Sequence, residues 1–214
     1  IKLVKYMAFY EHKNRYIKFQ EDIGTCKDIL TKTEFEKQKN NSIKNEGSSI
    51  IPFASGSPIN LKLNSKNSSF LGFGHSISNV LMVDNIINIT NLSGTPTNFA
   101  FSVPCPIEIK SISAFFSTTN TLSLIDTKVK IKAAIYKSNN NDNNFTAIDN
   151  AYVILEPELT SVVIMGNIIK GIKNDINIHI DAGTRLILAF TAETFGEPKS
   201  DVITGYASAG IEIL

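Results

Sequence analysis

The stretch Arg185-Leu186-Ile187-Leu188-Ala189-Phe190 decides the fold, because five apolar residues in a row follow Arg185. Successive side chains of a strand point to opposite faces, so this strand is apolar on both of its faces. A strand of that kind needs another sheet or another subunit to cover it. After a polar loop at residues 193–201, a second β-rich run ends in Gly205-Tyr206-Ala207-Ser208-Ala209-Gly210-Ile211-Glu212-Ile213-Leu214. Two such runs joined by a loop with Gly and Pro predict an antiparallel pair.

Similar short runs fill the chain from residue 50 onward. Residues 128–137 (KVKIKAAIYK) alternate lysine with apolar side chains, which predicts a strand with one face in the core and one in water. Strands are also expected at residues 98–103, 152–155 and 162–169, with a turn at Glu156-Pro157-Glu158 between the last two. The total is about eight to eleven short strands separated by turn residues, which is typical of a sandwich or barrel.

The pattern therefore predicts an all-β fold, a jelly-roll-type antiparallel β-sandwich. An immunoglobulin-like sandwich fits less well, because the chain contains no Trp. Residues 50–214 are expected to form this domain. Residues 1–49 are expected to be a tail or linker, since residues 34–46 are dominated by Lys, Glu, Gln and Asn. That segment is either poorly ordered or contains one short helix that ends at Gly24.

Composition describes a globular protein with little net charge. Hydrophobic residues make up 43% of the 214 residues, charged residues 19%, and the formal net charge is +1. A net charge this small does not suggest a nucleic-acid partner. No apolar run is long enough to span a bilayer, and no signal peptide is apparent. The cysteines, Cys26 and Cys105, are expected to be unrelated thiols, with Cys105 half-buried.

Motifs that carry chemistry are missing or incomplete. The nucleophile elbow G-x-S-x-G is approached at residues 74–78 and 205–210, but neither stretch has its spacing or precedes a helix. His75 and His179 belong to no metal-ligand pair. Glycines around Phe73 are expected to mark a bulge or a close backbone contact. We therefore expect no enzyme activity, no cofactor and no metal.

The chain has more apolar strands than one sandwich can bury, so apolar patches should remain on its surface. Such patches predict self-association, usually as a cyclic homo-oligomer. The residues expected in the core or in subunit contacts are Phe99, Phe101, Phe116, Tyr206 and Ile211. The residues alone do not separate these two roles.

Several stretches together resemble the C-terminal domain of BclB-type exosporium proteins, which lie on the spore surface of bacilli and clostridia. The match covers about residues 50–214 and rests on seven stretches in this order: IIPFASG (50–56), FLGFGHS (70–76), NFAFSVP (98–104), ISAFFSTTNTLSL (112–124), LEPELT (155–160), TRLILAF (184–190) and GYASAGI (205–211). The resemblance implies a non-enzymatic head domain, often carried on a collagen-like Gly-x-y stalk. It further implies a trimeric, tumour-necrosis-factor-like jelly roll on the spore surface or another extracellular surface. Residues 1–49 contain no Gly-x-y repeat.

The implied partners are copies of the chain itself, other spore-surface proteins, and host or environmental surfaces. The alternative function is a glycan- or receptor-binding jelly roll, similar to a lectin or a phage-fibre head. Such a module needs exposed aromatic rings beside Asn or Asp in a loop. The candidate loop residues are Asn139, Asn141, Asp142 and Phe145.

Overall fold

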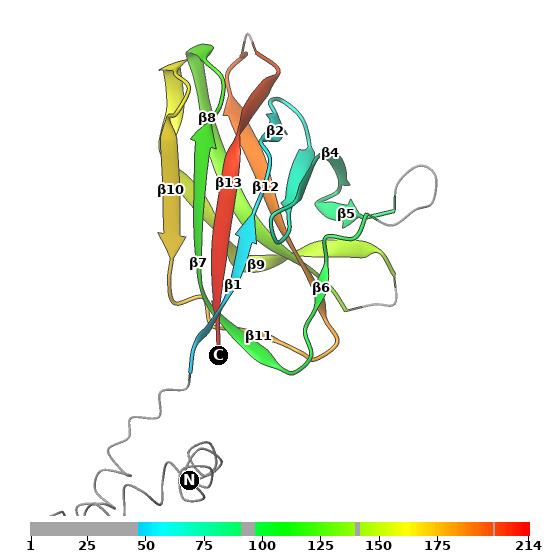
Figure 1. Cartoon of the computed structure of the whole chain (residues 1–214). Helices are drawn as coiled ribbons and strands as arrows, with labels where there is room; N and C mark the ends of the chain where they lie inside the picture. Colours follow the sequence, from blue (N-terminus) through cyan, green and yellow to red (C-terminus); the bar gives the residue numbers. More distant parts are fainter. Residues whose placement is uncertain (1–46, 91–96, 140–141, 199) are drawn as a thin grey trace, which may run out of the picture. The chain divides into compact units, whose positions relative to one another are not determined.

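Figure 1 shows the computed structural model of the chain, which describes residues 47–90, 97–139, 142–198 and 200–214. The helix expected before Gly24 and the thiol of Cys26 lie outside the described residues. The first strand begins at Ser49, one residue before the predicted domain start.

The described residues form thirteen strands, two more than the upper end of the range expected from the sequence. Their bounds are β1 (Ser49–Ala54), β2 (Ile59–Lys62), β3 (Asn67–Leu71), β4 (Ser76–Val83), β5 (Ile86–Asn88), β6 (Phe101–Ser102), β7 (Ile107–Thr118), β8 (Leu122–Ser138), β9 (Asn144–Val163), β10 (Ile168–Lys173), β11 (Ile178–Ile180), β12 (Arg185–Phe195) and β13 (Val202–Ile213).

The strands build two layers with antiparallel pairing. Sheet A has the order β1–β13–β7–β10, with β2 beside β13 and β11 beside β7. Sheet B has the order β3–β12–β8–β9, with β6 also on β12. Consecutive strands of the chain repeatedly cross from one sheet to the other, which is the jelly-roll arrangement. The predicted all-β, jelly-roll-type fold is confirmed.

The predicted pairing of the two C-terminal runs is wrong. β12 pairs with β3, β6 and β8 in sheet B, whereas β13 pairs with β1, β2 and β7 in sheet A. The loop between them therefore crosses between layers and does not close a hairpin. A strand that is apolar on both faces is covered better inside a layer than at its edge, and β12 lies between β3 and β8.

Side chains at even positions of β12 pack between the two sheets. Leu186, Leu188 and Phe190 belong to the main core, together with Phe116 from β7 and Ile131 from β8. Each of these five side chains is almost fully enclosed. Burial of one large apolar side chain contributes about 1.5–3 kcal/mol, so this layer supplies much of the stability.

Side chains at odd positions of β12 pack into a second core on the opposite face. Ile187 and Ala189 lie there with Phe70, Ile87 and Phe145. The strand pairings close this core into a ring, from β12 through β8, β9, β5, β4 and β3 back to β12. In Figure 1, β4 and β5 lie to the right of β12, away from sheet A. The chain thus covers both faces of β12 by itself.

Tyr136 of β8 is the polar member of the second core. Its hydroxyl donates to the sulfur of Met82 at 3.4 Å, and its ring is buried. Burial raises the pKa of Tyr136, because the phenolate would be poorly solvated there. The side chain is therefore a neutral structural group.

Some local predictions differ from the structure. Glu156-Pro157-Glu158 makes no turn, because β9 runs through it. Val129 pairs with Leu159 and Ile131 with Leu155, so the extra residues of β9 form a bulge. Residues 162–169 are not one strand, since a turn at residues 164–167 separates β9 from β10. Of residues 98–103, only two form a strand. Cys105 is exposed rather than half-buried, in the proline-flanked loop before β7.

Replacing Phe145 by Ala is expected to lower the free energy of unfolding by about 3–5 kcal/mol, because the side chain fills the second core. Phe195→Ala is the matched control. That ring is 51% exposed, with the Lys130 ammonium 5.4 Å from its centre, so its loss should cost less than about 1 kcal/mol. Guanidinium unfolding followed by circular dichroism measures both. Equal destabilisation by the two substitutions would contradict the second core.

Candidate functional site

The candidate site is the face of sheet A that points away from the main core. Buried and outward positions alternate along its strands, as in β13, where Ile203, Ala207 and Ile211 are buried. The name outer face of sheet A is used below for the outward positions Ile50, Pro52, Ala54, Ser111, Ser113, Phe115, Ser117, Ile168, Lys170, Ile172, Tyr206, Ser208, Gly210 and Glu212.

Strand register places small residues at the centre of this face. The neighbours across β1, β13 and β7 are the small residues Pro52, Gly210 and Ser113. On β10, Ile172 is the direct neighbour of Ser113. A side chain added at Gly210 would find its nearest neighbour atom, on Ile50, at 3.5 Å, so the space above this position is open. The centre of the face is consequently flat, and another backbone can approach it closely.

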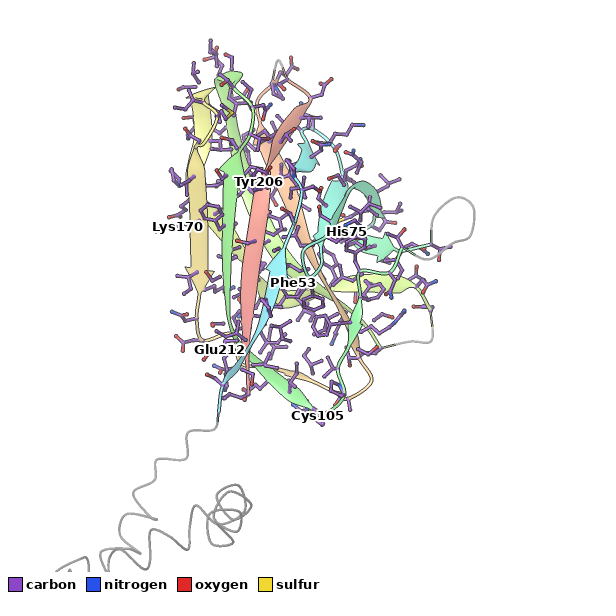
Figure 2. All side chains as sticks on the ribbon, viewed as in Figure 1. Phe53, His75, Cys105, Lys170, Tyr206 and Glu212 are labelled. Carbon is purple, nitrogen blue, oxygen red and sulfur yellow. The ribbon has the colours of Figure 1, made fainter. Side chains whose placement is uncertain are left out.

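Larger apolar side chains surround the small ones. Tyr206 is 49% exposed, Ile172 66% and Ile50 71%, and Ile168 is also exposed. Lys170 and Glu212 are the charged side chains of the outer face of sheet A. Figure 2 shows Lys170 on β10, Tyr206 on β13 and Glu212 nearer the end of β13. Charge is thus kept to the edges of the face.

Polar groups at the lower end of the face are bonded to one another. Ser111 Oγ donates to Glu212 Oε2 at 2.8 Å, and Lys110 Nζ lies 2.8 Å from Glu108 Oε2. Among the residues that the structure describes, no group of three or more His, Cys, Asp and Glu side chains lies close enough to hold a metal ion. The polar groups at this end of the face therefore pair with neighbours within the sheet.

The five residues expected in the core or in contacts separate into three environments. Phe116 and Ile211 are fully buried in the main core. Phe101 is half-buried against the main core and Phe99 against the second core. Tyr206 is on the outer face of sheet A. The sequence pattern named these residues together, because alternation alone does not tell which face of a strand meets the other sheet.

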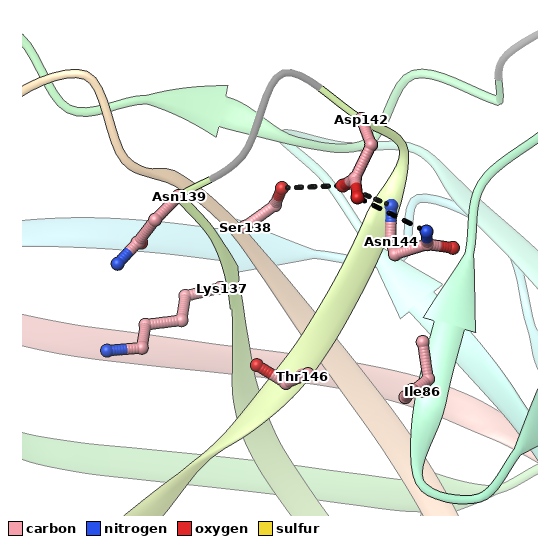
Figure 3. A pocket seen from close by; sticks show the side chains of 7 residues that line it. All are labelled: Ile86, Lys137, Ser138, Asn139, Asp142, Asn144 and Thr146. Carbon is pink, nitrogen blue, oxygen red and sulfur yellow. Dashed lines mark hydrogen bonds between the residues drawn. The ribbon is translucent and has the colours of Figure 1, made fainter.

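The candidate ligand loop lies in a different place, at the β8–β9 connection (Figure 3). Asn139 and Asp142 line an open hollow of about 490 Å³, together with Asn144 and the side chains of Ile86, Lys137, Ser138 and Thr146. Asp142 Oδ1 accepts from Asn144 N at 3.0 Å, and Asn144 Oδ1 accepts from Asn88 Nδ2 at 2.8 Å. These groups therefore hold the loop in shape.

Phe145 does not serve as the exposed aromatic ring of that loop. Its side chain is 0% exposed, and the Arg185 guanidinium lies 5.0 Å from the ring centre. The expectation that this ring is exposed to a ligand is wrong, because Phe145 fills the second core. Asn141 lies outside the described residues.

No protein-family model matches the chain. Over 174 residues, 77% of the chain, it is 24% identical to collagen-like protein 1 of Acanthamoeba polyphaga mimivirus. The match spans 18% of that viral protein's length. In the part of the chain that is described, no helix is long and apolar enough to cross a membrane.

Three solved structures illustrate the structural likeness. The Eiger TNF of S. frugiperda matches with a TM-score of 0.39 and 10% identity, over 78% of this chain and 92% of that one. A structure of infectious bursal disease virus strain Gx matches with a TM-score of 0.34 and 12% identity, over 78% and 32% of the chains. The stem and receptor-binding domain of spike protein P1 of bacteriophage PM2 matches with a TM-score of 0.25 and 13% identity, over 78% of this chain and 96% of that one. The jelly-roll topology itself follows from the strand pairing described above.

Proposed function

We propose that this chain is a non-enzymatic head domain that assembles with copies of itself through the outer face of sheet A, as a homotrimer. One observation carries the proposal. The outer face of sheet A spans four strands with two charged side chains, Lys170 and Glu212, while Tyr206, Ile168, Ile172 and Ile50 are left in water. Depletion of charge with exposed aromatic and aliphatic groups is what distinguishes the centre of an interface.

The shape of the face supports contact with another sheet. Small residues such as Ser113, Ser208 and Gly210 let a partner backbone approach closely, while Tyr206 supplies an anchoring ring. The two edges of the face differ, since Lys170 and Ile172 lie on β10 and Pro52 lies on β1. Unlike edges favour a head-to-tail contact, and such contacts give a ring when the rotation between neighbouring copies closes.

Resemblance supports the finer part of the proposal. The seven sequence stretches similar to BclB-type exosporium proteins imply a trimeric head, and the similarity to a viral collagen-like protein supports a head of the kind that a collagen-like stalk carries. We therefore place the domain on a spore surface, or on another cell or particle surface. Ser49 pairs with Ile213 near the C-terminus, so the start of β1 lies at the end of the domain opposite the β9–β10 turn (Figure 1).

The proposal includes no catalytic step. Among the described residues, Tyr136 is the one whose pKa is clearly shifted. Its hydroxyl is buried and donates to the sulfur of Met82. No cofactor is invoked. Assembly and surface presentation suffice to explain why the outer face of sheet A is flat and has few charged side chains.

Ser113→Lys is expected to abolish assembly, because it puts a charge at the centre of the outer face of sheet A, where a second copy would have to desolvate it. Sedimentation velocity at micromolar concentration should give the mass of three chains for the unaltered protein and of one chain for the variant. Thr160→Lys, at an exposed position of β9, is the control and should remain trimeric. An unaltered protein that sediments as a monomer would sink the proposal.

Antibodies raised against residues 47–214 are expected to label intact spores of the source organism, since a head domain faces outward. Electron microscopy with gold-labelled antibody measures this directly. Labelling that appears only after the spores are broken would count against surface presentation.

A further inference from the structure

Two exposed rings stand on the loop between β3 and β4, and each rests on a ring from another segment. Phe73, which is 66% exposed, stacks on Phe53 of β1 with 5.6 Å between ring centres and 18° between planes. His75 stacks on Phe99 at 5.5 Å and 14°. Because a neighbour covers one face of each ring, the opposite face is the one open to solvent. Figure 2 shows Phe53 and His75 on the same side of the domain.

Backbone contacts fix this loop in place. Ala54 N donates to Gly72 O at 2.9 Å, and Gly74 N donates to Ala54 O at 3.0 Å. Gly72 N also donates to the carbonyl of His75 at 2.8 Å. At Gly56 a Cβ atom would lie 2.1 Å from Gly74 O, so this close approach requires glycine there. The rings are therefore preorganised, and a ligand would not have to order them.

Further rings link the exposed pair to both cores. Phe101 lies 6.1 Å from Phe53 and 6.3 Å from Phe73, and Phe70 of the second core lies 6.4 Å from Phe99. Offset and tilted arrangements at these separations are the favourable ones for aromatic pairs. The open faces of Phe73 and His75 thus sit on a rigid aromatic base.

The segments that build this surface carry no charged residue. Residues 47–61, 67–83 and 97–107 contain no Asp, Glu, Lys or Arg, in a chain that is 19% charged. A phosphate-bearing ligand such as a nucleotide would find no cation there to pair with its charge. A ligand for this surface is accordingly neutral.

We infer that Phe73 and His75 form a binding site for a neutral carbohydrate, stacked against the open faces of the two rings. A pyranose ring presents a flat face of C–H groups and a rim of hydroxyls. The flat face of C–H groups matches the open faces of Phe73 and His75, since aromatic rings stack readily on flat groups. The ring nitrogens of His75 supply hydrogen-bond partners for the rim of hydroxyls, and Ser57 and Asn98, next in sequence to Gly56 and Phe99, are also exposed.

This site is separate from the surface proposed for assembly. Phe73 forms a backbone bridge with Ala54 at the end of β1, the edge strand of sheet A, and it is not part of the outer face of that sheet. Several copies in one assembly would present several such sites. Multivalent capture of a glycan-coated surface would follow from that arrangement.

The test uses the full chain on an array of neutral hexose, N-acetylhexosamine and deoxyhexose glycans, with sialylated and sulfated glycans alongside. Calorimetric titration with the strongest binder then gives the affinity of a single site. We expect binding to neutral glycans, weakened about tenfold by Phe73→Ala and also weakened by His75→Ala. Phe73→Tyr keeps the ring and should bind like the unaltered chain. Phe195→Ala removes an exposed ring elsewhere and should have no effect.

The outcomes separate this inference from the assembly proposal. Binding by a chain that sediments as a monomer would support the carbohydrate site while contradicting the trimer. No binding to any neutral glycan would overturn the inference, as would unchanged affinity in folded Phe73→Ala and His75→Ala variants. If Phe73→Ala instead dissociates the assembly, the rings are a contact between copies and the carbohydrate site is wrong.

Discussion

The structure depends on covering both faces of β12. Leu188 and Phe190 on one face, and Ile187 and Ala189 on the other, are all fully buried. Leaving either face in water would lose the burial of several side chains, and the burial of each large one contributes about 1.5–3 kcal/mol to stability. Sheet A covers the first face. The segment that includes β3, β4 and β5, with part of β9, covers the second and closes a ring of strands around Phe145.

This internal covering decides where the remaining apolar surface lies. The chain itself covers β12 on both faces, so β12 gives no reason for self-association. The outer face of sheet A receives no such cover, and its exposed groups include Tyr206 and Ile172. Beyond its β1 edge, Phe73 and His75 lie on segments without charged residues. The two surfaces have few charged side chains and are suited to different partners, a second copy and a neutral carbohydrate.

The sequence predicted those features of the fold that depend on residues close together in the chain. Alternation in residues 128–137 correctly placed Val129, Ile131 and Ile135 in the core, and the apolar run at residues 186–190 correctly predicted a strand buried on both faces. Long-range pairing was not predictable. A polar loop before β13 looks the same whether it closes a hairpin or crosses between sheets. Phe145 follows a run of Asn and Asp as an exposed ring would, and only its contact with distant β5 and β12 shows that it is buried. The stacking of Phe73 on Phe53 and of His75 on Phe99 was missed, because the four rings come from three separate segments.

Hydroxyl-radical footprinting of the full chain, at concentrations above and below the assembly transition, tests directly whether the outer face of sheet A is buried between copies. Tyr206 should be protected from oxidation in the concentrated sample and become reactive on dilution, whereas Tyr152, which is exposed on β9, should react in both. Oxidation of Tyr206 to the same extent at both concentrations would contradict assembly through this face.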